Sequence, residues 1–314
     1  MDFNVRIFRI LLENFIKSDY TLLPFEQFLG NHRHNTIFLR HDIDRLPENA
    51  VLLAEHEKEL GIRGTYFFRQ RFFGNHSEII SRVYSLGHEI GYHYEDLASA
   101  VRMLKAKNKR EGSSGLYNFK EKDRFEKDLA ALAIESFAEN LENLRRVAPV
   151  KTICMHGSPM SKWDSRLLWK YYDYHDFGIT GEPYFDIDFE KVLYLTDTGR
   201  RWDGEQVSVR DKTMVAGCSA QGENPYKDWK IKPINFRNDL SIPLSVNPCP
   251  SSSKYKFHST SDIIKAAEEG RLPDKIMITF HPQRWTDKRL PWLKEFIWQN
   301  VKNMGKYLIV KLAH

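Results

Sequence analysis

Two aspartates with one residue between them, Asp42 and Asp44, directly follow an apolar run that begins at residue 36. Carboxylates at positions i and i+2 beyond a strand can point to the same side. One of them could hold a divalent cation while the other takes a proton from a water molecule that the cation activates. The alternative for Asp44 is structural, as a cap of the helix that is expected to start near Pro47.

A second polar segment reads Gly-His-Glu-Ile-Gly-Tyr-His over residues 87–93. In a strand, His88 and His93 face opposite sides because their separation is odd. His93 stands at the expected strand end and is the better metal ligand, whereas His88 is expected to be structural. Glu89 or Glu95 could support a ligand through a hydrogen bond to its second nitrogen.

Polar residues recur at the carboxyl ends of the expected strands. Five such ends carry His41, His93, His156, Asp197 and His281. Ligand and active sites of parallel α/β proteins lie at that edge of the sheet. Core histidines would not be expected to line up in this way, so the pattern favours a site at this edge.

The elements that must position these residues alternate along the chain, which favours parallel strands joined by helices. We expect strands at 36–41, 64–69, 88–93, 152–156, 177–180, 192–196, 275–281 and 307–311. We expect helices at 46–60, 77–86, 123–147, 259–269 and 291–304, and an amphipathic helix at the N-terminus. The chain is expected to form one domain over residues 1–314, with loop insertions near 96–120 and 203–257.

The motif with Asp42 and Asp44, and the segment 87–91 followed by His93, resemble the polysaccharide deacetylase family of carbohydrate esterases. The segment 61–68 is similar to the family's second strand, and the strand that ends in His281 is similar to its C-terminal catalytic strand. The resemblance covers residues 36–97 and 275–285.

This resemblance implies an α/β fold, a distorted (β/α) barrel of about seven parallel strands. It implies Asp42 as the general base, Asp44 and His93 as metal ligands, and His281 as the general acid. Members of the family hydrolyse N-acetyl or O-acetyl groups on sugars, and some relatives open cyclic amides.

The chain departs from the family pattern in two places. The family's metal motif is His-x-x-x-His, but the position four residues after His93 is Leu97, which cannot bind a metal. The third ligand is therefore expected to be His156, with Glu95 as the alternative. The arginine that pairs with the base in the family is not found at the fourth strand, and the candidates to replace it are Arg40, Arg200 and Arg201.

Two further segments combine charges with an indole ring. Candidate substrate-binding residues are Asp197, Arg200, Arg201, Trp202, Arg284 and Trp285. The arginines could hold an anionic group of a substrate, and a tryptophan could form a wall of a sugar site. The alternatives are a surface turn with ion pairs for the first segment and a core position for Trp285.

Composition sets the class of protein. Hydrophobic residues make up 41% of the 314 residues, enough for a full core. The net charge of +5 comes from dispersed residues, which does not favour nucleic-acid binding.

Three widely spaced cysteines form neither a disulfide framework nor a paired metal motif, and they fit a reducing compartment. No apolar run reaches the roughly 18 residues of a membrane span, and the N-terminus lacks the apolar segment of a signal peptide. We therefore expect a cytoplasmic protein.

Together these features predict a metal-dependent hydrolase, with zinc as the first choice because imidazole and carboxylate ligands suit it. The expected substrate is a carbohydrate or a sugar-containing small molecule. The expected reaction is deacetylation of an acetamido sugar or glycan precursor in the synthesis of surface polysaccharide of the O-antigen or capsule type. Two alternatives remain: a hydrolase of another C–N bond, such as a cyclic imide or ureide, and a sugar-binding pseudoenzyme, which Leu97 suggests.

Overall fold

A parallel sheet forms the centre of the protein in the computed structural model, which describes residues 2–110, 122–157, 163–202 and 255–312. The strands are β1 (Thr21–Leu23), β2 (Thr36–Ile43), β3 (Thr65–Phe68), β4 (Glu89–Tyr94), β5 (Val150–Met155), β6 (Leu193–Thr196) and β7 (Lys275–Phe280). Their order is β5-β4-β3-β2-β7-β6, and β1 pairs with β2. Each of these pairings is parallel.

Strand β2 lies at the centre of the sheet and is buried along its whole length. β7 pairs with it from Thr36 to His41 on one side. On the other side, β1 pairs with its first residues and β3 with its last, from Arg40 to Ile43. The carboxyl end of β2 is therefore held between two strands, which fixes the position of the residues that follow it.

The α/β class and the seven parallel strands agree with expectation, but the pairings do not close the sheet into a barrel. Among the described residues, no ladder joins the edge strands β5 and β6. Beyond β5, an isolated parallel bridge pairs Thr152 of that strand with Gly181.

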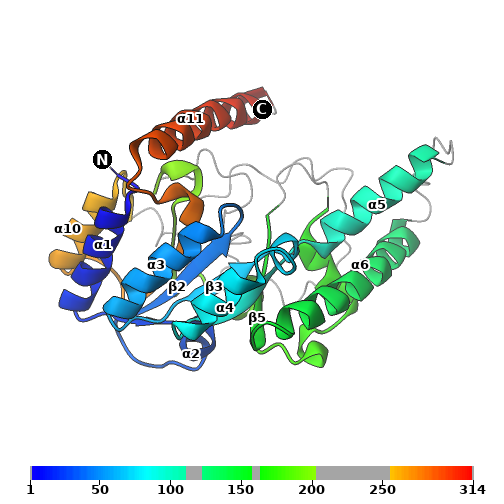
Figure 1. Ribbon diagram of the computed structural model, residues 1–314, viewed down its shortest axis with the longest axis horizontal. Coiled ribbons are helices and arrows are strands. Elements are labelled where there is room, and N and C mark those ends of the chain that lie inside the picture. Colours follow the sequence, from blue (N-terminus) through cyan, green and yellow to red (C-terminus); the bar gives the residue numbers. More distant parts are fainter. Residues whose placement is uncertain (1, 111–121, 158–162, 203–254, 313–314) are drawn as a thin grey trace.

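Helices cover the sheet. They are α1 (Val5–Lys17), α2 (Phe25–Leu29), α3 (Glu48–Glu59), α4 (Ser77–Ser85), α5 (Asp96–Arg110), α6 (Lys122–Arg145), α7 (Leu168–Tyr171), α8 (Pro183–Asp186), α10 (Thr260–Glu268) and α11 (Arg289–Leu312). Figure 1 shows α1 and α10 side by side at one end of the molecule and α5 with α6 at the other. Within the described part of the chain, none of these helices combines the length and the apolar character that crossing a membrane requires.

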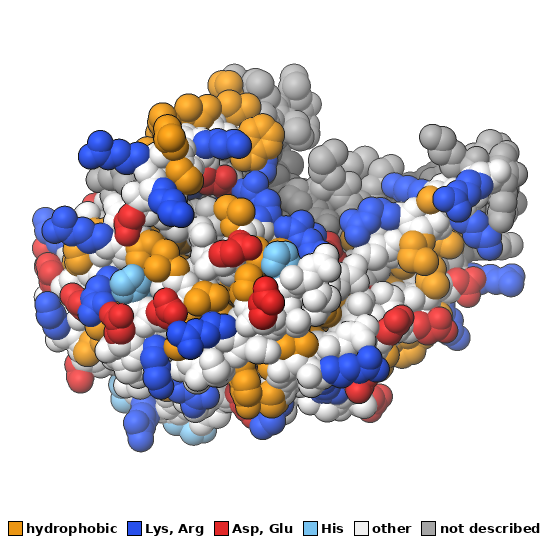
Figure 2. Space-filling view, in the orientation of Figure 1, with side chains coloured by type: hydrophobic (Ala, Val, Ile, Leu, Met, Phe, Trp, Pro, Cys, Tyr) orange, Lys and Arg blue, Asp and Glu red, His pale blue; other side chains and the backbone are white. Residues whose placement is uncertain are grey.

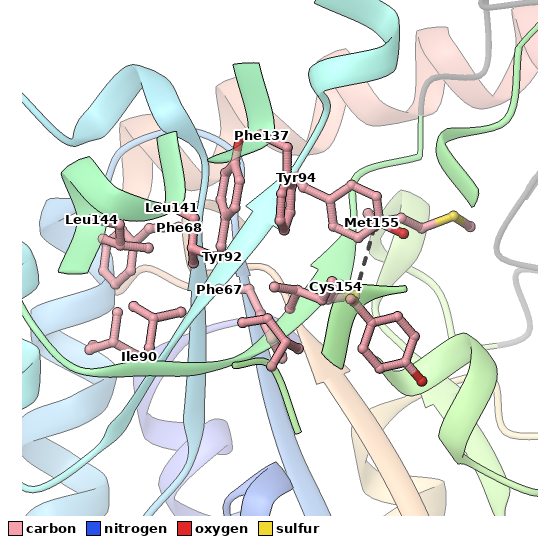
Figure 3. Packing of buried hydrophobic residues seen from close by; sticks show 14 of the residues in the cluster. Phe67, Phe68, Ile90, Tyr92, Tyr94, Phe137, Leu141, Leu144, Cys154 and Met155 are labelled. Carbon is pink, nitrogen blue, oxygen red and sulfur yellow. Dashed lines mark hydrogen bonds between the residues drawn. The ribbon is translucent and has the colours of Figure 1, made fainter. Parts of the chain in front are cut away.

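The core has two parts, and neighbouring side chains of β2 belong to different ones. Ile37 and Leu39 of β2 pack with residues of α1 and α10, whereas Phe38 packs on the other face with Phe25. Figure 3 shows part of this second cluster, in which Phe137 of α6 lies against side chains of β4. The alternation along β2 is what sends Arg40 and Asp42 to the opposite face from His41.

Three expected elements are wrong. Residues 96–110 form α5 rather than a loop, because Leu97 and Ala100 bury one side of a helix against the core. The segment 177–180 does not form a strand, since a short 3₁₀ turn (Tyr174–Phe177) runs into it. Residues 307–311 belong to α11 rather than to a strand. The expected loop at 203–257 lies outside the described residues except for its last three positions.

Candidate metal and catalytic site

The site is built on the carboxyl end of β2, where Arg40 and Asp42 face the same side of the sheet. Both are buried, and they form a bidentate pair. Arg40 Nε donates to Asp42 Oδ1 at 2.8 Å, and a guanidinium Nη2 donates to Oδ2 at 2.6 Å. The partner of Asp42 is thus Arg40, two residues earlier in the same strand, and not Arg200 or Arg201.

This pairing sets the protonation state of the carboxylate. Burial alone would raise the pKa of Asp42, but Arg40, with smaller contributions from His93 and His281, lowers that pKa below its ordinary value. Asp42 is therefore ionised at neutral pH and can accept a proton only from a donor that is itself activated.

Asp44, His93 and His156 form a cluster beside this pair. Asp44 Oδ1 lies 3.1 Å from His156 Nδ1 and 3.8 Å from His93 Nε2. The two imidazoles approach to 3.2 Å between His156 Nδ1 and His93 Nε2. Three ligands at about 2.0–2.1 Å from a tetrahedral ion are about 3.3 Å apart, so the three side chains could hold a metal ion.

The protonation states of the cluster fit this role. Burial lowers the pKa of His93 to about 4, so its ring is neutral at pH values where metals bind. His93 Nδ1 lies 2.9 Å from the carbonyl oxygen of Cys154, which requires the proton on Nδ1 and leaves the lone pair of Nε2 directed at the cluster. Burial alone would raise the pKa of Asp44, but its contact with His156 lowers that pKa well below its ordinary value.

A close approach in the sheet explains the glycine two residues before His93. A Cβ atom on Gly91 would come within 2.3 Å of the ring of Phe67 on β3. Any larger residue would push β4 away from β3 and displace His93 from the cluster.

His156, and not Glu95, completes the group. Both oxygens of Glu95 accept hydrogen bonds from Arg69, at 2.9 and 2.7 Å. Leu97, at the position of the family's second histidine, is fully buried in the core. Asp42, His93 and Cys154 also lie close enough to hold an ion; this group shares His93 with the first, and its aspartate is paired with Arg40.

His281 faces the cluster from β7, with its Nε2 3.9 Å from Asp44 Oδ2. Its Nδ1 lies 2.6 Å from Asp197 Oδ1, and its backbone N–H donates to Oδ2 at 2.9 Å. Burial alone would raise the pKa of Asp197, but Arg284 and His281 lower it to about 2. Nδ1 also lies 2.8 Å from Arg284 Nη1, so it faces both a carboxylate oxygen and a guanidinium donor, while Nε2 is turned toward Asp44.

Three of the expected substrate-binding residues, Arg284, Trp285 and Trp202, make contacts within the protein and do not line a substrate surface. Arg284 and Trp285 each donate to Asp197, at 2.5 and 2.6 Å, and Trp285 is fully buried. Trp202 is also buried and donates to Thr260 at 2.9 Å. Arg284 and Trp285 order the partner of His281, and burial removes the faces of both tryptophans from contact with a sugar ring.

The two arginines of the same segment differ. The guanidinium of Arg200 is buried between aromatic rings, lying 4.5 Å from the centre of the Trp292 ring. Burial lowers its pKa to about 10. Arg201 is exposed at the end of the 3₁₀ turn Thr198–Arg200, so it remains a candidate for substrate contact.

The expectation that His41 belongs to the site is wrong, because the alternation along β2 turns it into a polar cluster on the opposite face of the sheet. His41 Nε2 lies 2.6 Å from Glu57 Oε1 on α3, and the ring of His41 stacks on Tyr66 at 4.1 Å. Tyr66 donates to Glu57 Oε2 at 3.0 Å. His88 accepts from the backbone N–H of Gly64 at 3.1 Å, as expected of a structural histidine.

Searches of protein-family models and of curated proteins found no match to this chain. What the site can do must therefore be argued from its own geometry.

Proposed function

We propose that the protein is a metal-dependent amide hydrolase that removes the acetyl group from an acetamido sugar or a glycan precursor. The observation that carries this proposal is the convergence of three ligand side chains with an ionised aspartate and an oriented histidine. Asp42 and His281 reach the cluster from β2 and β7, which are neighbouring strands.

Asp44, His93 and His156 would hold the ion, and zinc suits a set of one carboxylate and two imidazoles. A divalent cation bound there lowers the pKa of water and polarises a carbonyl oxygen. Arg69, whose guanidinium lies 3.9 Å from Asp44 Oδ1, adds positive charge next to the carboxylate ligand.

Asp42 would take the proton of the attacking water. Each of its oxygens accepts one hydrogen bond from Arg40, and a carboxylate oxygen has a second lone pair for a further donor. Arg40 fixes the rotamer of the carboxylate and keeps it ionised, so that it is ready as an acceptor. The general-base role is expected to contribute about 10²–10⁴ in rate.

His281 would donate a proton to the leaving amine from the imidazolium form, in which Nε2 carries a proton as well as Nδ1. Asp197 holds its Nδ1, so Nε2 is the nitrogen that can exchange a proton on the side of the cluster. The same contact stabilises the positively charged imidazole, as in other histidines that are oriented by a buried carboxylate.

The choice of an acetylated sugar is supported by the likeness of residues 36–97 and 275–285 to the polysaccharide deacetylases. The test is the release of acetate from N-acetylated sugars, sugar nucleotides and oligosaccharides by the zinc-loaded protein. Loss of this release in Asp42→Asn and in His281→Ala is the expected result. Hydrolysis of cyclic imides or ureides, and not of these substrates, would show that the protein cleaves a different C–N bond. Absence of any hydrolysis by the fully metal-loaded protein would refute the proposal.

A further inference from the structure

Helix α11 is oriented with its polar side toward the protein and its apolar side toward solvent. Gln299 and Asn303 are buried, and Asn303 donates to the carbonyl oxygen of Gly199 at 3.0 Å. The exposed large hydrophobic residues of this helix are Leu290, Leu293, Phe296, Ile297, Trp298, Val301 and Met304. A surface helix of a soluble protein normally shows the reverse arrangement.

Four of these exposed residues lie along one side of the helix. Leu290, Ile297, Val301 and Met304 are separated by seven, four and three positions, which places them on the same side of a helix. They are 81%, 54%, 52% and 63% exposed. Figure 2 shows hydrophobic side chains gathered at the top of the molecule, over α11 in Figure 1.

The charges of α11 are almost all positive. Lys294 is exposed among the apolar residues, four positions from both Leu290 and Trp298, and Lys302 is exposed with its Nζ 4.9 Å from the ring centre of Trp298. The helix sequence also contains Arg289, Lys306 and Lys311. Glu295 is the one acidic residue in the sequence of α11; it is half-buried and accepts from Arg45 at 3.1 Å.

We propose that α11 docks the protein on an anionic membrane surface, with the helix lying in the plane of the interface. Helices that bind in this way have Trp, Phe and Leu on one side and Lys or Arg beside them. The lysine stems can reach past the apolar face, so that their ammonium groups meet lipid phosphates.

Charge decides between a membrane and a second copy of the chain. In a two-fold contact between copies, the lysines of both helices would approach each other without an acidic partner from α11. Anionic headgroups supply the missing negative charge along the whole helix.

Docking would also orient the candidate site. Arg45 follows Asp44 and binds Glu295. The guanidinium of Arg200 lies over the ring of Trp292 and donates to the carbonyl oxygen of Trp292. Through these contacts α11 is joined to the carboxyl edge of the sheet, which would face the bilayer.

The test uses the full chain with vesicles of phosphatidylcholine alone or mixed with phosphatidylglycerol, and measures the bound fraction by flotation. We expect binding to the anionic vesicles and much weaker binding to the neutral ones. Ile297→Glu and Val301→Glu should each abolish it. Lys294→Gln and Lys302→Gln should each lower the partition coefficient about fivefold. Met103→Glu on α5, where the side chain is 61% exposed, is the matched control and should bind like wild type.

Circular dichroism and thermal melting check that the variants are folded, as expected for exposed positions. Absence of wild-type binding to anionic vesicles overturns the proposal, and so does binding that Ile297→Glu leaves unchanged. A dimer in light scattering that Ile297→Glu converts to monomer, with no vesicle binding, would assign the face to self-association instead. Vesicle binding requires no turnover, so its failure is separate from failure of the proposed hydrolysis.

Discussion

Replacing Asp197 with asparagine removes one negative charge from a fully buried position while keeping the shape of the side chain. The carboxylate accepts from the backbone and ring of His281, from Arg284 and from Trp285, over distances of 2.5 to 2.9 Å. An asparagine offers one acceptor oxygen and an NH₂ group. In Asp197→Asn, some of these donors must therefore face another donor.

The pKa of Asp197 gives the lower bound of the effect. Its fall from 3.8 to about 2 in the folded protein is worth about 2.5 kcal/mol at neutral pH. Removing one partner of a buried ion pair costs about 3–5 kcal/mol, because the other charge is left uncompensated. These two figures describe the same interactions, so we expect Asp197→Asn to lower the free energy of unfolding by about 2.5–5 kcal/mol.

The effect should depend on pH in one direction. Because the folded-state pKa of Asp197 lies below its ordinary value, the stabilisation is present above about pH 4 and is lost as the pH falls through about 2. The difference in stability between wild type and Asp197→Asn should therefore be constant near neutral pH and should shrink on acidification.

Urea unfolding followed by circular dichroism and tryptophan fluorescence measures this difference. Asp188→Asn is the matched control, because Asp188 forms an exposed ion pair with Lys191 that is worth at most about 1 kcal/mol. Equal stabilities of Asp197→Asn and Asp188→Asn would refute the reasoning. A difference that persists unchanged below about pH 3 would show that the charge of Asp197 is not its cause.

Three further substitutions test the site and its support. His156→Ala should weaken zinc binding by more than about 100-fold, which exceeds the usual effect of removing a residue that only hydrogen-bonds to a metal ligand. In the same competition titration, His175→Ala, at an exposed position, should leave the zinc affinity unchanged. Asp42→Asn should keep its zinc in elemental analysis and lose about 10²–10⁴ in turnover; loss of the metal instead would place Asp42 among the ligands. Glu57→Gln should destabilise the fold by about 3 kcal/mol in urea unfolding, while Glu55→Gln, exposed on the same helix, should change stability by less than about 0.5 kcal/mol.

The strands that carry the site could be predicted from the sequence, because each is a short apolar run that ends in a polar residue. The expected strands at 36–41, 88–93, 152–156 and 275–281 correspond to β2, β4, β5 and β7. The N-cap residue also allowed the start of α10 to be predicted, and Ser259 forms a capping box there with Asp262. Parallel strands bring such ends to one edge, so the grouping of the site residues followed from the strands alone.

The elements that were missed depend on contacts that lie far away in sequence. Residues 96–110 are polar on average, and their helix is stabilised by a few apolar side chains that pack on α6. Strand β1 has three residues and pairs with β2 through Thr21–Leu23, which gives too short a pattern to recognise. Tyr307, Ile309 and Val310 are residue types that favour a strand, yet the segment continues α11.

The chemical role of each site residue was harder to predict from the sequence than its place at a strand end. The indole of Trp285 and the guanidinium of Arg284 follow His281 in sequence, which suggested a surface for substrate. The 3₁₀ turn Pro282–Arg284 instead folds these side chains back toward Asp197. The sequence shows which residue types are near one another, but it does not show which side of a turn they face.

The consecutive residues Arg40, His41 and Asp42 explain why the candidate site depends on the far face of the sheet. Arg40 and Asp42 form their ion pair on one side, and His41 binds Glu57 of α3 on the other. A shift of β2 by one residue would turn the histidine toward the site and would move Arg40 and Asp42 together to the far face, away from the metal cluster. Such a shift would separate His41 from Glu57, so the contact on the far face favours the native register. The cluster under α3 therefore contributes to the position of Asp42 and Asp44, although none of its members reaches the metal cluster.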